Sequence, residues 1–212
     1  SSQKWFFWKY DFENKVFEQV EREYELPPMA RPSASAMSAD KNDLLWMTSS
    51  GYTQPTTLYL ADADKNNSNK IVKQLPAGYD ATGLVVEQNE ATSKDGTKIP
   101  YFVVRRKDQK ADGQNPTLLY GYGGFEVSLL PGYSATVGIG WLEKGGTWVE
   151  ANIRGGGEFG PKWHQAALKE NRNKAYEDFI AVGEDIIQRK ITSTPKLGIM
   201  GGSNGGLLMG NM

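Results

Sequence analysis

The chain has 212 residues, of which 39% are hydrophobic and 23% charged, a composition typical of a globular protein with a sizeable core. Its 24 basic and 25 acidic residues give a formal net charge of -1, which argues against nucleic acid or an anionic membrane as the main partner. No apolar run is long enough to predict a transmembrane helix. The sequence has no cysteine, which excludes disulfides and thiolate catalysis, and its single histidine, His164, cannot build a histidine-rich zinc site. We therefore expect no metal and no cofactor, while the compartment stays open, cytoplasmic or periplasmic if the protein is bacterial.

The first part of the chain, up to about residue 75, is rich in aromatic and β-branched residues separated by turn clusters. The predicted strands pair across short turns and cover residues 4–10 with 15–20, and 43–49 with 56–61. Leu26-Pro27-Pro28 interrupts this pattern, and residues 62–69 form a polar tip. Short antiparallel strands at this spacing suit a β-sandwich or a propeller blade, and an ordinary β-rich extension fits them equally well.

From about residue 76 onward, predicted strands alternate with predicted helices. The strands cover residues 84–88, 99–105, 117–120, 147–153 and 197–200, and the helices cover 133–144 and 174–189. The second helix has the clearest apolar face, formed at helical spacing by Tyr176, Phe179, Ile180, Gly183, Ile186 and Ile187. Strands alternating with helices indicate an α/β fold with a mainly parallel sheet.

A glycine-rich turn after the last predicted strand carries the clearest chemical motif. Gly201-Gly202-Ser203-Asn204-Gly205 fits the pattern G-x-S-x-G, with a buried strand before it and a helix after it. Such a turn holds the serine on strained backbone and exposes its hydroxyl, and small residues two positions to either side let strand and helix approach closely. The helix N-terminus then directs N–H groups at developing negative charge. Ser203 is the predicted nucleophile, and the alternative is a turn that merely packs a strand on a helix.

Two further glycine clusters follow predicted strands. The cluster within residues 120–125 comes where a hydrolase of this type supplies an oxyanion-hole donor, and glycine lets backbone approach a substrate. The other lies within residues 152–158. Neither is followed by the lysine of a P-loop or fits a dinucleotide-binding fingerprint, which argues against both kinds of site.

Together, the three clusters closely resemble the prolyl oligopeptidase family. The matching segments are Tyr-Gly-Tyr-Gly-Gly-Phe at 120–125, Ala-Asn-Ile-Arg-Gly-Gly-Gly-Glu-Phe-Gly at 151–160 and Gly-Gly-Ser-Asn-Gly-Gly-Leu-Leu at 201–208, in the family's order and spacing. Lys-Asp-Gly-Thr-Lys-Ile-Pro at 94–100 looks like the start of that family's hydrolase domain. The resemblance implies a partial α/β-hydrolase catalytic domain over residues 76–212, preceded over residues 1–75 by strands of the last blades of a β-propeller.

The resemblance also implies an activity, which is the cleavage of short peptides on the carboxyl side of proline. Ser203 would be the nucleophile, and the backbone N–H of Asn204 and the hydroxyl of Tyr122 would form the oxyanion hole. Phe125 would help to line the proline pocket, unless it is an ordinary core aromatic. Arg154 would tie loops together near the site.

The remaining triad residues are not found in this chain. In α/β-hydrolases the order is serine, acid, histidine, and residues 204–212 contain no Asp, Glu or His. His164, Asp178 and Asp185 all precede the serine, so chain order argues against each of them. We expect the acid and the histidine beyond this chain, and the isolated chain to have little or no activity because a serine without its base is a poor nucleophile.

The chain order has one structural consequence, and two alternative functions remain open. With no strand after it, the segment 197–200 would be an apolar sheet edge, and such edges favour self-association. A relative similar to oligopeptidase B would cleave after basic residues instead of proline. A non-enzymatic reading is a binding or assembly module that recruits a partner through its exposed edges.

Overall fold

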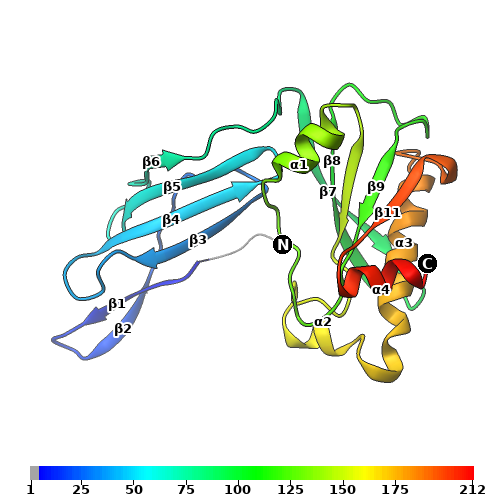
Figure 1. The fold of residues 1–212 in the computed structure, drawn as a ribbon. Helices are drawn as coiled ribbons and strands as arrows, with labels where there is room; N and C mark the ends of the chain where they lie inside the picture. The colour runs from blue at the N-terminus through cyan, green and yellow to red at the C-terminus, as the bar shows by residue number, and fades with distance from the viewer. Residues whose placement is uncertain (1–4) are drawn as a thin grey trace. The chain divides into compact units, whose positions relative to one another are not determined.

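The computed structural model describes residues 5–212 (Figure 1). These form two compact units. One contains the residues up to Ala77 together with Pro131–Tyr133, and the other contains Gly78–Leu130 and Ser134–Met212. The assignment of residues 1–75 to propeller blades and of residues 76–212 to a catalytic domain stays a prediction.

The first unit contains a β-hairpin and a four-stranded antiparallel sheet. The hairpin pairs β1 (Phe7–Asp11) with β2 (Val16–Val20), and the sheet pairs β3 (Ala30–Ala36), β4 (Leu44–Gly51), β5 (Gln54–Asp62) and β6 (Lys70–Gln74) in chain order. Side chains alternate in burial along β4 and β5, as expected when successive residues point to opposite faces. Met47, Tyr59 and Ala61 form the core of this sheet. Four antiparallel strands in chain order are the architecture of one propeller blade.

The outer strands of this sheet, β3 and β6, were not predicted from the sequence. β3 reads ARPSASA and is mostly exposed, and β6 reads KIVKQ and is exposed throughout. The apolar positions of β3 hold only Ala and Pro, and β6 has two apolar residues side by side, so neither strand shows the alternation of large apolar and polar residues that marks a half-buried strand. Both are held by backbone pairing to an inner neighbour, which local sequence does not report.

The second unit is built on a five-stranded sheet with the order β11-β9-β10-β8-β7. Its strands are β7 (Leu84–Thr92), β8 (Lys98–Arg106), β9 (Thr117–Tyr120), β10 (Thr147–Ala151) and β11 (Leu197–Met200). β9 runs parallel to both β10 and β11, whereas β8 is antiparallel to both β7 and β10. The mainly parallel arrangement expected from the sequence therefore holds for β9, β10 and β11 only. The reason is that β7 and β8 form a hairpin, closed by the hydrogen bond from Ser93 N–H to Thr97 O.

The helices of the second unit vary in length. They are α1 (Ala135–Val137), the π-helical turn η1 (Gly138–Leu142), α2 (Pro161–Gln165), the 3-10 turns η2 (Lys169–Asn171) and η3 (Thr194–Lys196), α3 (Asn173–Gln188) and α4 (Asn204–Gly210). The helix predicted over 133–144 is thus only one α-helical turn followed by a π turn, and Gly138 packs there directly against the ring of Tyr79. No helix within residues 5–212 has the length and apolar character needed to cross a membrane.

Helix α3 supplies much of the core of the second unit. Its buried residues are Ala175, Asp178, Phe179, Ala181, Val182, Gly183 and Ile186. They pack with Tyr101 and Val103 of β8 and with Leu119 of β9. The predicted apolar face included Ile180, but 47% of this residue is exposed. The true face is rotated and carries a charged residue, Asp178, that no apolar pattern could have placed inside.

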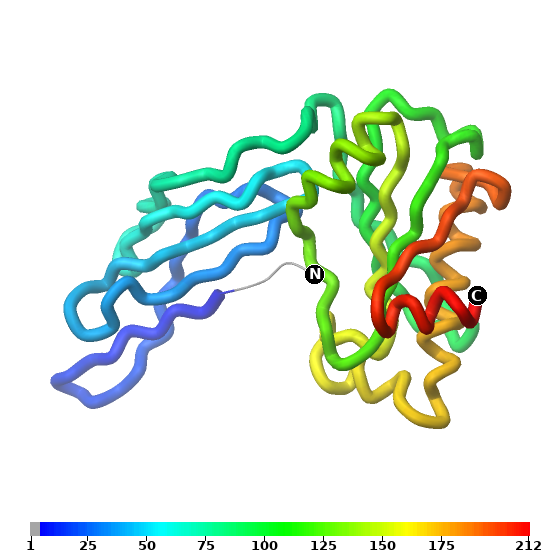
Figure 2. The backbone as a smooth tube through the Cα atoms, in the orientation of Figure 1, coloured from blue at the N-terminus to red at the C-terminus, as the bar shows by residue number. Residues whose placement is uncertain are grey.

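β11 forms one edge of the sheet, as the sequence predicted. In Figure 2 the orange-red tube of β11 continues directly into the red tube of α4. Ile199 and Met200 of β11 are 40% and 49% exposed. Self-association through this edge remains a prediction.

Candidate active site

Ser203 lies in the sharp turn between β11, which ends at Met200, and α4, which begins at Asn204. The serine is exposed and has φ 52° and ψ -118°, a left-handed conformation that is strained for a residue other than glycine. Within residues 5–212, its hydroxyl forms no hydrogen bond with a histidine or a carboxylate. The predicted strand–turn–helix geometry with a strained, exposed serine is therefore present.

The glycines two positions to either side of Ser203 are required by close backbone contacts. A Cβ atom on Gly205 would lie 2.5 Å from the carbonyl oxygen of Gly121, and one on Gly201 would lie 2.6 Å from that of Gly205. Carbon and oxygen do not approach so closely without a shift of the backbone. The motif G-x-S-x-G is thus explained by sterics, because strand, turn and helix meet with no room for side chains.

The glycine cluster after β9 lies beside this turn, because β9 and β11 are parallel neighbours whose carboxyl ends meet at one edge of the sheet. The side-chain Nδ2 of Asn204 donates to the carbonyl oxygen of Tyr122 at 2.5 Å. A Cβ on Gly124 would lie 2.5 Å from that same nitrogen. Asn204 therefore holds the Tyr122 loop against the serine turn through its side chain.

The two aromatic residues of this loop differ in exposure. Tyr122 is partly buried, whereas Phe125 is 76% exposed and has φ 52°. An exposed position excludes the core role that the sequence left open for Phe125 in this chain. The contribution of either side chain to substrate binding remains a proposal.

The third glycine cluster, after β10, also packs on the loop after β9. Gly155 has φ 96° and lies directly against the carbonyl oxygen of Gly123. The N–H of Glu126 donates to the carbonyl oxygen of Gly155 at 3.3 Å, and the N–H of Gly157 donates to that of Val127 at 3.3 Å. The three glycine clusters thus form one continuous backbone assembly, in which the loop after β9 contacts both the serine turn and the loop after β10.

Arg154 ties this assembly to the rest of the unit. The residue is only 4% exposed, and its guanidinium binds both carboxylate oxygens of Asp178 at 2.9 and 2.6 Å and both of Asp95 at 2.6 and 3.2 Å. Ser93 donates to Asp178 at 2.6 Å. Hydrogen bonds from Arg154 hold the pKa of Asp95 well below its ordinary value, and the hydrogen bond to Asp178 raises the pKa of Arg154. Arg154 joins the β7–β8 turn, α3 and the loop after β10, which is the structural role implied by the resemblance.

Two further residues near the site were not found from the sequence. Arg172, at the start of α3, binds the carbonyl oxygen of Gly123 and donates to Oδ1 of Asn204 at 3.3 Å. Glu158 accepts a hydrogen bond from Leu129 N–H at 3.0 Å through Oε1, but its buried Oε2 has no hydrogen-bond partner within residues 5–212. Burial raises the pKa of Glu158. Arg172 lies outside the three glycine clusters, and Glu158 lies within the 151–160 segment but has no role implied by the resemblance, so only their contacts in space mark them.

The remaining titratable residues considered as triad members are engaged elsewhere. Nδ1 of His164 lies 2.7 Å from Gly155 O and 3.1 Å from Glu126 N, so this nitrogen holds loop backbone. Asp178 is bound to Arg154, and Asp185 accepts from the Tyr101 hydroxyl at 2.5 Å and from Arg189 at 2.7 Å. These contacts agree with the argument from chain order that none of the three activates Ser203.

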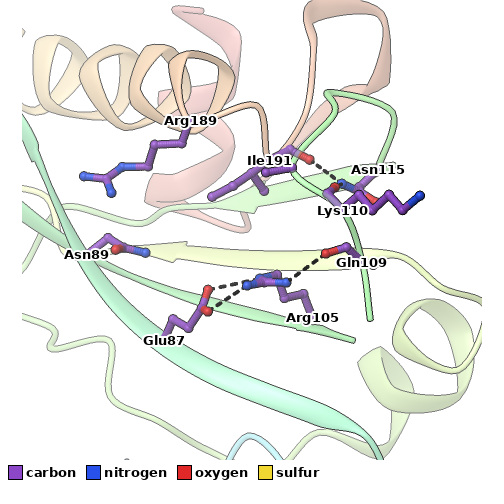
Figure 3. Close-up of a pocket in the computed structure, with 9 residues that line it drawn as sticks. Glu87, Asn89, Arg105, Gln109, Lys110, Asn115, Arg189 and Ile191 are labelled. Atoms are coloured by element: carbon purple, nitrogen blue, oxygen red, sulfur yellow. Dashed lines mark hydrogen bonds and ion pairs between the residues drawn. The ribbon is translucent and has the colours of Figure 1, made fainter. Parts of the chain in front are cut away.

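A cavity of about 400 Å³ lies at the other end of the sheet, away from the glycine clusters. Figure 3 shows the residues that line it. It is lined by residues near the end of β8, before β9 and after α3, among them Arg105, Asn115 and Ile191. Arg105 binds both carboxylate oxygens of Glu87, at 3.0 and 2.8 Å, and the carbonyl oxygen of Gln109 at 3.3 Å. None of the predicted site residues lines this cavity. Within residues 5–212, no group of three or more histidine, cysteine, aspartate or glutamate side chains is arranged to hold a metal ion.

Comparison with known proteins identifies the family of the chain. The family model described as "Prolyl oligopeptidase family" matches residues 133–212. An uncharacterized peptidase, y4nA, of Sinorhizobium fredii is 58% identical over 186 residues, which cover 86% of this chain and 26% of that protein.

Two solved structures resemble the chain closely. A post-proline cleaving enzyme from Rickettsia typhi has a TM-score of 0.82 and 42% identity over 96% of this chain and 29% of its own. Oligopeptidase B from Leishmania major has a TM-score of 0.82 and 30% identity over 97% of this chain and 30% of its own. The chain thus spans between 26% and 30% of the length of these proteins. With its α/β fold, its blade-like sheet and its three glycine clusters, the chain belongs to the prolyl oligopeptidase family.

Proposed function

We propose that this chain is the part of a serine endopeptidase that carries the nucleophile and the oxyanion hole, and that the whole enzyme cleaves short peptides on the carboxyl side of proline. The observation that carries the proposal is the strained, exposed Ser203 between β11 and α4, in a glycine turn that packs on the glycine cluster after β9. Strain at an exposed residue is retained where the surrounding structure imposes it, and such positions gather at active sites.

In the proposed reaction, the Ser203 hydroxyl oxygen attacks the carbonyl carbon of the scissile peptide bond. A base outside this chain takes the hydroxyl proton and returns it to the leaving amine, and water then hydrolyses the acyl-enzyme. The backbone N–H of Asn204 serves as one oxyanion donor, because the first residue of α4 has no acceptor within the helix. The hydroxyl of Tyr122 is the second donor.

Two features support specificity for proline. The post-proline cleaving enzyme is 42% identical to this chain, against 30% for oligopeptidase B at equal TM-score. In addition, Phe125 lies in the loop after β9, next to the serine turn, and its exposed ring can contact an apolar proline ring. Cleavage after basic residues, as expected of an oligopeptidase B-like enzyme, is the second candidate.

The acid and the base of the triad lie outside this chain in our proposal, so that the isolated chain has little or no hydrolytic activity. The basis is the engagement of His164, Asp178 and Asp185 in other contacts and their position before Ser203 in the sequence. Without a base the serine hydroxyl is a weak nucleophile. An assembly or binding module without catalysis is the non-enzymatic alternative.

The test uses the whole protein that contains this chain. It is treated with a fluorophosphonate probe and assayed with matched peptides that carry proline, arginine or alanine before the scissile bond. We expect one adduct, cleavage after proline, and a loss of turnover by about 10⁴-fold or more in Ser203→Ala. Ser193→Ala, a control at the other end of the sheet, should keep full activity.

Each of the other outcomes would support a different function. Cleavage only after arginine would favour the oligopeptidase B-like specificity. Absence of both adduct and cleavage would leave the binding module. The isolated chain should form no adduct, and a Ser203-dependent adduct there would show that a base is present within it.

A further inference from the structure

Arg172 occupies a position between the two segments that carry the proposed oxyanion donors. One guanidinium nitrogen, Nη1, donates to the carbonyl oxygen of Gly123, in the loop that follows Tyr122. The other, Nη2, donates at 3.3 Å to Oδ1 of Asn204, the residue after the nucleophile. A single planar side chain therefore bridges backbone from the end of β9 and a side chain from the start of α4.

The bridge is closed by Asn204 itself. Its Nδ2 donates to the carbonyl oxygen of Tyr122 at 2.5 Å, while its Oδ1 accepts from Arg172. The three hydrogen bonds form a ring that runs from the guanidinium through Gly123 and Tyr122 to Asn204 and back. This ring fixes the carbonyl of Tyr122 relative to the first turn of α4, and so fixes the two proposed donors relative to each other.

The contacts described for the Arg172 guanidinium are with the two segments and not with a carboxylate. No carboxylate within residues 5–212 forms a salt bridge with Arg172. Its guanidinium carbon lies 5.4 Å from the ring centre of Tyr176, one helical turn further along α3, which limits its motion. Arg154, by contrast, is saturated by two carboxylates.

We propose that Arg172 is a positioning residue for the oxyanion hole, acting through the Tyr122 loop and Asn204. The inference rests on the proposed function of Ser203, Asn204 and Tyr122. Oxyanion donors stabilise charge that develops only in the transition state, so an error in their spacing lowers kcat more than it changes KM. Only the fork of an arginine reaches both acceptors at once, because a lysine is a single donor centre.

The experiment compares Arg172→Lys and Arg172→Met with the parent in the whole protein. The substrate is the peptide that the protein cleaves best, and active sites are counted by fluorophosphonate labelling at saturation. We expect kcat per labelled site to fall by about 10- to 100-fold in both variants, the scale of a small misplacement of catalytic groups, with KM within about 2-fold. Arg106→Met is the matched control, because Arg106 is an exposed arginine near the other end of the sheet that pairs only with Asp108.

A double-mutant cycle with Tyr122→Phe separates positioning from general stability. If Arg172 acts through the Tyr122 donor, its removal costs much less in the Tyr122→Phe background than in the parent. Fully multiplicative losses would overturn the proposal. It would also be overturned if Arg172→Met lowered only the labelled fraction and Tm, with kcat per labelled site unchanged. Failure of the proposed function gives a different result, because Ser203→Ala would then keep its activity.

Discussion

The two ends of the five-stranded sheet differ in how they are packed. At the carboxyl ends of β9, β10 and β11, three glycine clusters bring backbone into close contact, and one of them carries a strained, exposed serine. At the other end, a cavity of about 400 Å³ is lined by side chains that already satisfy one another, such as Arg105 and Glu87 (Figure 3). This cavity thus lies at the end of the sheet that does not carry the serine motif.

The difference between the two ends shows which features mark the candidate active site. A cavity offers volume, but groups that are paired within the protein have little left to offer a substrate. The glycine end has little side-chain volume, yet it presents the start of a helix and a serine hydroxyl that, within residues 5–212, forms no hydrogen bond with a histidine or a carboxylate. An exposed hydroxyl on a fixed backbone turn, and not a cavity, distinguishes the candidate site.

The largest expected effect comes from removing one arginine from each end. Arg154→Met should lower the free energy of unfolding of this chain by about 3–5 kcal/mol, because Asp178, which is fully buried, would lose its counter-charge. Arg105→Met should cost about 1 kcal/mol or less, because its partner Glu87 remains partly exposed to water. Urea denaturation of both variants measures the difference. Equal losses would contradict the claim that, of the two ends, only the end with the glycine clusters depends on a buried ion pair.

A medium effect is expected from adding one methyl group to the serine turn. Gly205→Ala places a Cβ 2.5 Å from the carbonyl oxygen of Gly121, and the overpacking should cost about 1–3 kcal/mol. It should also reduce probe labelling of Ser203 in the whole protein. Gly206→Ala is the matched control, since its Cβ would have no neighbour closer than 3.8 Å and alanine favours a helix by about 1 kcal/mol. Unchanged labelling in Gly205→Ala would show that the close contact does not shape the turn.

The smallest effect concerns pH and Glu158. Its pKa is raised by burial, so the folded chain keeps the proton to higher pH than the unfolded chain. The stability it contributes is therefore fully present below the ordinary value of 4.5 and is lost as pH rises through the folded pKa. Glu158→Gln should make stability fall less between about pH 4.5 and 7, as measured by urea denaturation across that range.

Asp95 supplies a control of opposite sign. Its pKa is lowered by the hydrogen bonds from Arg154, so its contribution is present above the ordinary value of 3.8 and is lost as pH falls further. Asp95→Asn should flatten the acid side of the stability profile and leave the slope toward neutral pH unchanged. If Glu158→Gln flattened the acid side instead, the buried carboxyl would not be the group that is responsible.

The sequence by itself determined much of this protein. It located the strand–turn–helix motif of Ser203 and predicted the strands over 117–120 and 197–200 with the bounds that the structure has. It also identified the three glycine clusters as one family signature. These features are local, because each depends on the order of apolar residues, turn residues and glycines along a short stretch.

Other features were decided by tertiary structure alone. The burial of Asp178 depends on Arg154, which lies 24 residues earlier. Arg172 meets Gly123 from 49 residues away and Asn204 from 32. Strands β3 and β6 depend on backbone pairing with an inner strand. In each case, burying a charge or forming a strand is favourable only when a partner distant in sequence pairs with the polar groups involved. The packing of the sheet, and not the local sequence pattern, places that partner beside them.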